Sequence, residues 1–187
     1  MAFTPAISIR LATVGIAGAA VAFTGLPAQA ADTPAPATTT TLSPAQKRAQ
    51  TLRDKRTAAR ERANRQRSSL VRVALNQKGD RYVGGASGPN AFDCSGFTMW
   101  VYKTALGKYL PHYSGAQMNK ARRVGRKHLK PGDLLFFGPG GSQHVSMYIG
   151  KGRMIHATNP RSGVRIDSIN MGYYRARFAG AGRIIKG

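Results

Sequence analysis

The sequence predicts an α+β protein in which helices come first and a mostly antiparallel sheet follows. Helix caps and helical apolar spacing dominate the segment from Ser43 to about Ala105. After Lys130 the pattern changes to short apolar runs separated by Gly-containing turns, which is typical of strands. With 187 residues, 42% of them hydrophobic, the chain is long enough for one ordinary domain with appendages.

Residues 1–30 have the layout of a signal peptide. Arg10 precedes an apolar run over residues 11–25, and Ala28-Gln29-Ala30 forms an A-x-A cleavage site. The run is too short and too rich in glycine to serve as a membrane anchor. We therefore expect cleavage after Ala30, export to the outside of the cell or its wall, and no transmembrane segment afterwards.

Residues 31–42 consist of Ala, Pro and Thr with single Asp and Leu residues. Such a composition has almost nothing to bury, and its prolines favour extended backbone. We predict a linker here, without a fold of its own.

Residues 43–68 form the basic helical segment. Ser43 is suited to an N-cap, Pro44 to the first helical position and Gln46 to closing a capping box. Its cationic residues fall on nearly every face, so the helix has little to bury. They are Lys47, Arg48, Arg53, Lys55, Arg56, Arg60, Arg62, Arg65 and Arg67. The segment is either a solvated spacer or a surface that binds an anion, and the sequence leaves both open.

Residues 69–187 are predicted to form the main domain. A second helix begins near Ser69 and ends before Gly79, and a third runs from Ser95 to about Ala105 after a Gly-rich loop. The third helix buries Phe97, Val101 and Leu106. The predicted strands are Leu134–Phe137, Val145–Ile149, Arg153–Ala157 and Val164–Asp167.

Composition excludes several functional classes. The chain has 29 Lys and Arg against 7 Asp and Glu, a formal net charge of +22, which favours polyanionic partners. From residue 81 onward the only acidic side chains are Asp93, Asp133 and Asp167, which argues against a two-carboxylate glycosidase or a HExxH metalloprotease. One cysteine allows neither a disulfide framework nor a CxxC metal site.

Cys94 is the single cysteine, and its position suggests reactivity. It stands where a Gly-rich loop meets an apolar helix, between Asp93 and Ser95. The free N–H groups and the dipole at a helix N-terminus favour the thiolate, which is the nucleophilic form of cysteine. The alternative is a small, inert core residue.

A cysteine nucleophile needs a base, and the base needs an orienting group. His144 opens the strand Val145–Ile149, and His156 follows twelve residues later. A hairpin about Gly150-Lys151-Gly152 would bring the two rings together. His112 and His128 lie in loop-like sequence, so we expect both to be surface residues without such a partner.

The segment from Ser69 to Ile185 resembles the NlpC/P60 family of bacterial cell-wall cysteine peptidases, which have a reduced papain-like fold. The resemblance is carried by four motifs in order: Phe92-Asp93-Cys94-Ser95-Gly96, Leu129–Phe137, His144–Gly150 and Met154-Ile155-His156-Ala157. It implies Cys94 as nucleophile, His144 as general base and His156 as the residue that orients it. It also implies that the Tyr82 hydroxyl faces the site, and that Asp93 and Ser95 belong to its oxyanion- or substrate-binding part.

One stretch departs from the family pattern. Where many members have an aromatic residue and two glycines after the tyrosine, this chain has Val83, Gly84, Gly85 and Ala86. The change falls on the substrate-side wall of the pocket and leaves the catalytic positions in place.

The implied reaction is hydrolysis of a peptidoglycan stem peptide at the bond between γ-D-glutamate and the diamino acid, through a Cys94 thioester. The oxyanion would be bound by the Cys94 backbone N–H and the Tyr82 hydroxyl. No metal and no organic cofactor is expected, and the protein is expected to be a monomer. Peptidoglycan and anionic wall polymers are the expected partners, since the basic segment lacks the interleaved aromatic residues of a nucleic-acid binder.

Two other functions remain open at this point. The same fold and nucleophile could serve an amidase, an acyltransferase or a transglutaminase acting on another amide. Alternatively, the chain could be a polycationic wall-binding protein whose catalytic site has degenerated.

Overall fold

A computed structural model describes residues 42–186 and confirms the α+β class. The signal peptide, and the linker up to residue 41, lie outside the described residues and stay predictions. The described elements are α1 (Pro44–Leu75), β1 (Arg81–Tyr82), β2 (Ala91–Phe92), α2 (Cys94–Leu106), α3 (Ser114–Lys120), β3 (Arg122–Val124), β4 (Leu134–Phe137), β5 (His144–Gly150), β6 (Arg153–Ala157), β7 (Val164–Ser168), α4 (Gly172–Arg177) and β8 (Phe178–Arg183). Short 3₁₀ turns occupy Arg126–His128 and Pro139–Gly141.

Helix α1 joins the two helices that the sequence suggested into one. It begins as predicted, since the Ser43 hydroxyl accepts from the Gln46 amide at 3.3 Å and the Gln46 side chain accepts from the Ser43 amide at 2.7 Å. The prediction of a new helix at Ser69 was wrong. Serine lowers helix stability only slightly and is no breaker, so the helix continues through Ser68 and Ser69.

The two ends of α1 have different environments. Residues 42–62 are exposed throughout, whereas Ala63, Arg67, Leu70 and Ala74 are buried at intervals of three and four positions, on one helical face. Arg67 donates to the Pro131 carbonyl at 3.1 Å. The basic segment is therefore exposed at its start and part of the main domain at its end.

The main sheet has six strands in the order β3-β8-β4-β5-β6-β7, and every neighbouring pair is antiparallel. The four predicted strands are β4 to β7, and they occupy consecutive places. β8 was missed because Phe178–Arg183 contains Gly180 and Gly182, which lack side chains for an alternating pattern. A separate parallel pair, β1 and β2, precedes α2.

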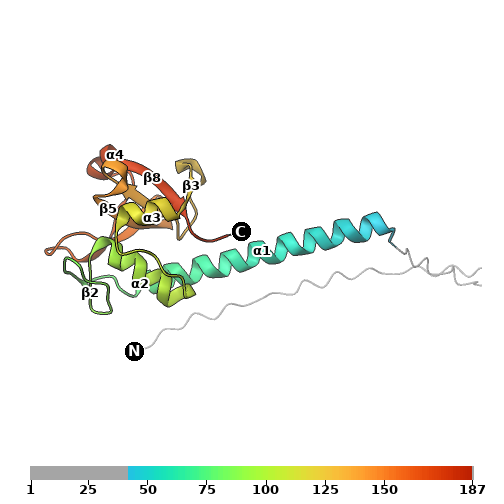
Figure 1. Ribbon diagram of the computed structural model, residues 1–187, viewed down its shortest axis with the longest axis horizontal. Coiled ribbons are helices and arrows are strands. Elements are labelled where there is room, and N and C mark those ends of the chain that lie inside the picture. The colour runs from blue at the N-terminus through green and yellow to red at the C-terminus, as the bar shows by residue number, and fades with distance from the viewer. Residues whose placement is uncertain (1–41, 187) are drawn as a thin grey trace, which may run out of the picture. The chain divides into compact units, whose positions relative to one another are not determined.

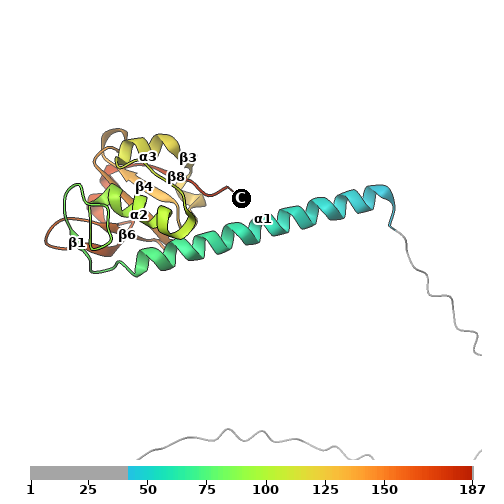
Figure 2. The same cartoon turned by 60° about the horizontal axis from the view of Figure 1, so that its bottom comes forward.

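The core lies between α2 and the sheet. Phe97, Val101 and Tyr102 of α2 are fully buried against strands β5 and β6, which contribute Met147 and Ile155. Helix α1 passes along α2 and extends away from the sheet (Figure 1), and the turned view shows α2 between α1 and the sheet (Figure 2). In residues 42–186 we find no helix both long enough and apolar enough to cross a membrane.

Candidate active site

Cys94 is the first residue of α2, as the sequence predicted, and its side chain is partly exposed. Asp93 caps the helix, because its carboxylate accepts from the Gly96 amide at 2.6 Å and from the Ser95 hydroxyl at 3.0 Å. The carbonyl of Ala86 crosses directly over the first turn. A Cβ at Gly96 would lie 2.2 Å from that oxygen, so only glycine lets the loop hold the start of the helix in place.

The thiol of Cys94 is less acidic than its position at the helix N-terminus suggests. Burial raises its pKa, and the negative charge of Asp93 acts in the same direction. The backbone N–H groups of Val145, Ser95 and Cys94 itself hydrogen-bond the thiolate and offset part of this effect. The predicted stabilisation of the thiolate is therefore present but smaller than the cost of burying its charge.

The predicted contact between the two histidines is present. His144 Nε2 lies 2.7 Å from His156 Nδ1, and the rings are 5.0 Å apart between centroids. Strands β5 and β6 form the expected hairpin, with Lys151 at φ 51° between two glycines in the turn. Cys94 packs against the core cluster that includes Val145, the residue after His144, so the start of α2 lies against β5.

Asp167 extends this chain and was not identified from the sequence. Its carboxylate lies 3.1 Å from His156 Nε2 and accepts from Arg165 at 2.8 and 2.9 Å. In β7 Arg165 pairs with His156, so Arg165 and Asp167 share the sheet face of His156. The period-two spacing of an arginine and an aspartate in the last predicted strand was the available signal.

The hydrogen bonds fix which ring nitrogens carry protons. The pKa of Asp167 is held below its usual value, against the effect of burial, by Arg165 and His156, so it is an ionised acceptor. His156 therefore donates from Nε2, and in its neutral form must accept at Nδ1. His144 then donates from Nε2, which leaves an unprotonated Nδ1 as the ring nitrogen available to the thiol.

Both histidines are held neutral. Burial lowers the pKa of His144 to about 3 and that of His156 to about 4, and the charge of Asp167 opposes the shift in each case. Since burial also raises the pKa of Cys94, the free site rests as a thiol beside a neutral imidazole. Such a pair reacts when the imidazole removes the thiol proton during attack.

Tyr82 lies at the same site. Tyr82 and Cys94 pack against the same core cluster. Burial raises the pKa of the Tyr82 hydroxyl, and the charges of Cys94 and Asp93 raise it further. The neighbouring loop has little bulk, because a Cβ at Gly84 would meet no atom within 4 Å. The departure from the family pattern thus leaves this wall of the site open.

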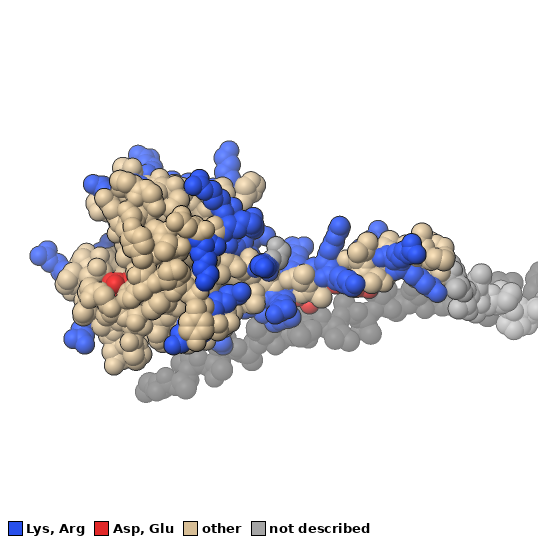
Figure 3. All heavy atoms as spheres, in the orientation of Figure 1, with Lys and Arg blue, Asp and Glu red and all other residues tan. Residues whose placement is uncertain are grey.

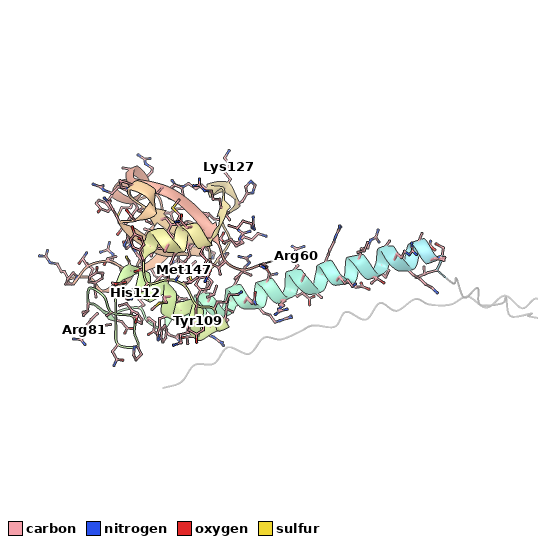
Figure 4. The ribbon with its side chains drawn as sticks, viewed as in Figure 1. Arg60, Arg81, Tyr109, His112, Lys127 and Met147 are labelled. Carbon is pink, nitrogen blue, oxygen red and sulfur yellow. The ribbon has the colours of Figure 1, made fainter. Side chains whose placement is uncertain are left out.

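His112 is exposed, as expected, but the expectation that it has no partner was wrong. Its Nε2 lies 2.9 Å from Asp93 Oδ2, which also accepts from the Gly85 amide at 2.9 Å. Burial opposes ionisation of Asp93, but the bonds from Gly96, His112 and Ser95 hold its pKa below the usual value. Figure 4 shows His112 at the end of the domain remote from Arg60. His128 is exposed, as expected.

No group of three or more side chains suited to holding a metal ion occurs in the described part of the chain. The structure thus brings together Cys94, His144, His156 and Tyr82, with Asp93 and Ser95 at the helix cap. A thiol at a helix N-terminus beside a hydrogen-bonded imidazole on an antiparallel sheet is the arrangement of papain-like cysteine hydrolases.

Comparison with known proteins agrees with that class. The model of the NlpC/P60 family matches residues 79–183, and the chain belongs to this family. It is 40% identical over 117 residues to probable endopeptidase p60 of Listeria innocua, across 62% of this chain and 24% of that protein. It is 37% identical over 113 residues to peptidoglycan endopeptidase RipA of Mycobacterium tuberculosis, across 54% of this chain and 24% of that protein.

Two further matches bear on chemistry and fold. A γ-D-glutamyl-L-lysine dipeptidyl-peptidase of Bacillus cereus is 40% identical over 108 residues, across 56% of this chain and 32% of that protein. The crystal structure of an NlpC/P60 family protein from Bacillus cereus has a TM-score of 0.62 and 35% identity, covering 64% of this chain and 40% of that one. The chain spans about a quarter to a third of the length of these curated relatives.

Proposed function

We propose that this protein is an exported cysteine endopeptidase that hydrolyses peptidoglycan stem peptides in the cell wall, at the bond from γ-D-glutamate to the diamino acid. The observation that carries the proposal is the chain of hydrogen bonds from Asp167 through His156 to His144, which leaves His144 Nδ1 free to act as a base for the Cys94 thiol. The similarity to the p60, RipA and dipeptidyl-peptidase relatives supports peptidoglycan as the substrate.

The reaction begins with proton transfer from the Cys94 sulfur to His144 Nδ1 as the sulfur attacks the amide carbonyl. The new S–C bond places negative charge on the carbonyl oxygen, and the Cys94 amide and the Tyr82 hydroxyl are the donors proposed to bind it. His144 then protonates the departing amine as the C–N bond breaks, which leaves a thioester.

Water completes the cycle. His144 takes a proton from the water that attacks the thioester, and the acyl group leaves as a carboxylic acid while the sulfur regains its proton. His156 acts as a positioning residue, because it holds His144 in the tautomer that has a free Nδ1. We assign Asp93 and Ser95 to the acyl side of the site, since they flank the nucleophile on α2.

A cavity of about 420 Å³ with both polar and aromatic lining residues adjoins His144. Since His144 protonates the departing amine, the diamino acid must lie on this side. The cavity is lined by Phe137, Gln143, His144, Thr158, Asn159, Met171, Tyr173, Tyr174 and Arg177. Its aromatic walls suit a methylene chain, and Arg177 is the one cation among these lining residues. We propose that it accepts a diamino acid whose side chain ends in a carboxylate.

Replacing Cys94 with alanine is the direct test of the function. The full chain incubated with purified peptidoglycan is expected to release stem-peptide fragments, and Cys94→Ala to release none, because no other group can form the thioester. Mass spectrometry of the soluble products identifies the bond that is cut. Fragment release by the variant at the rate of the parent chain, or no release by either, would rule the proposal out.

Arg177→Gln tests the leaving-group preference. We expect its KM to rise about tenfold for a γ-D-glutamyl-diaminopimelate peptide, because a charge-assisted hydrogen bond is lost. The matched lysine peptide should change little. Arg175→Gln is the control, since Arg175 lies on the same short helix but does not line the cavity. Equal losses on the two peptides would contradict the preference while leaving the hydrolase intact.

A further inference from the structure

Two adjacent cavities on the side of α1 and the C-terminus form a basic groove. One, of about 550 Å³, is lined by Ala58, Ala59, Arg62, Gln66, Lys108 and Lys186. The other, of about 320 Å³, is lined by Lys108, Lys120, Arg122, Arg183, Ile184, Ile185 and Lys186. Because Lys108 and Lys186 border both, the two cavities lie side by side. We call this surface the basic groove.

The basic groove is cationic along its whole length. Arg183 is engaged with Asp133, but the other five cations make no ion pair within residues 42–186. These five are Arg62, Lys108, Lys120, Arg122 and Lys186. No acidic side chain occurs among the lining residues, and Figure 3 shows Lys and Arg gathered where the domain meets α1. Five unneutralised cations around one depression repel one another unless an anion is bound.

The α1 wall of the groove lies where the exposed start of the helix meets its first buried turn. Ala58, Arg62 and Gln66 recur every fourth residue and so share one helical face, beside the face that packs through Ala63 and Arg67. The groove therefore combines the middle of α1 with residues of the main domain. A solvated spacer would not need such a junction.

We propose that the basic groove binds a linear phosphodiester polyanion that carries no bases, such as a poly(glycerol phosphate) chain. A polymer with one charge per repeat matches a row of cations, whereas peptidoglycan offers isolated carboxylates. Nucleic acid is disfavoured because neither cavity has an aromatic lining residue on which a base could stack. The groove shares no lining residue with the cavity at His144, so binding there leaves the catalytic cleft free.

Binding of a defined poly(glycerol phosphate) oligomer to the full-length Cys94→Ala chain tests the proposal. We expect Lys108→Gln with Lys186→Gln to weaken binding about twenty-five-fold, since each cation at an anionic surface contributes about fivefold. The matched control is Arg53→Gln with Lys55→Gln, which removes equal charge from the exposed start of α1 and should cost threefold or less. The dependence of affinity on salt should also become shallower only in the groove variant.

The binding measurements distinguish the basic groove from two alternative explanations. Equal losses in the two double variants would show that net charge alone attracts the polymer, and would overturn the groove. Tighter binding of an oligothymidylate of the same charge would overturn the choice of ligand in favour of nucleic acid. Thermal unfolding of each variant excludes loss of fold as the cause. Because the background lacks the nucleophile, these results do not depend on whether the enzyme cleaves peptidoglycan.

Discussion

Asp167→Asn is expected to lower kcat/KM on a γ-D-glutamyl stem peptide by about 10³- to 10⁴-fold while leaving the fold intact, because an orienting carboxylate selects the tautomer of its histidine. An asparagine amide can donate to His156 Nε2, which puts the proton of His156 on Nδ1. His144 must then accept at Nε2 and carry its own proton on Nδ1, where it can no longer act as a base. Steady-state kinetics measures the loss.

The pH profile distinguishes this positioning role from simple damage. Activity needs neutral His144. Burial lowers the pKa of His144 to about 3, and the negative charge of Asp167 opposes this shift. Removing that charge lowers the pKa further, so the acid limb of kcat/KM should move to lower pH. Asp167→Glu, which keeps the charge, should recover part of the activity. An unshifted limb together with normal activity in Asp167→Asn would refute the tautomer argument.

Asp133→Ala is expected to lower the free energy of unfolding by about 3–5 kcal/mol, the typical effect of breaking a buried ion pair. Asp133 is fully buried and bonds Arg183 at 2.6 and 2.7 Å and the Lys130 amide at 2.8 Å. Arg67 lies 3.8 Å away. The variant leaves two nearly buried guanidinium groups without their counterion, and urea unfolding measures the loss.

Two further variants serve as controls for Asp133→Ala. Asp54→Ala, on the exposed start of α1, should stay within about 0.5 kcal/mol of the parent chain. Asp133→Leu combined with Arg183→Leu should be more stable than Asp133→Ala, because one of the two uncompensated charges is also removed. A loss below about 1 kcal/mol in Asp133→Ala would mean that the burial of this cluster is not maintained in solution.

The sequence predicted the elements that have strong local signals. The capping box at Ser43 depends on a few adjacent residues, and α1 and α2 begin where expected. The hairpin about Lys151 was equally local, which is why the contact of His144 with His156 could be foreseen. Strand β8 could not be foreseen in this way, because it is held in place by pairing with β3 on one side and β4 on the other.

For the site, the sequence by itself determined the identity of the thiol and the imidazoles, because Cys94 is the only cysteine and the four motifs occur in order. The tertiary structure decided the pKa values and the hydrogen-bond partners of those groups. Burial, which sums contributions from many distant residues, raised the pKa of Cys94 against the helix N-terminus and lowered that of His144. Asp167 reaches His156 through the pairing of β6 with β7, and His112 reaches Asp93 through the packing of its loop, and neither contact follows from adjacent residues alone.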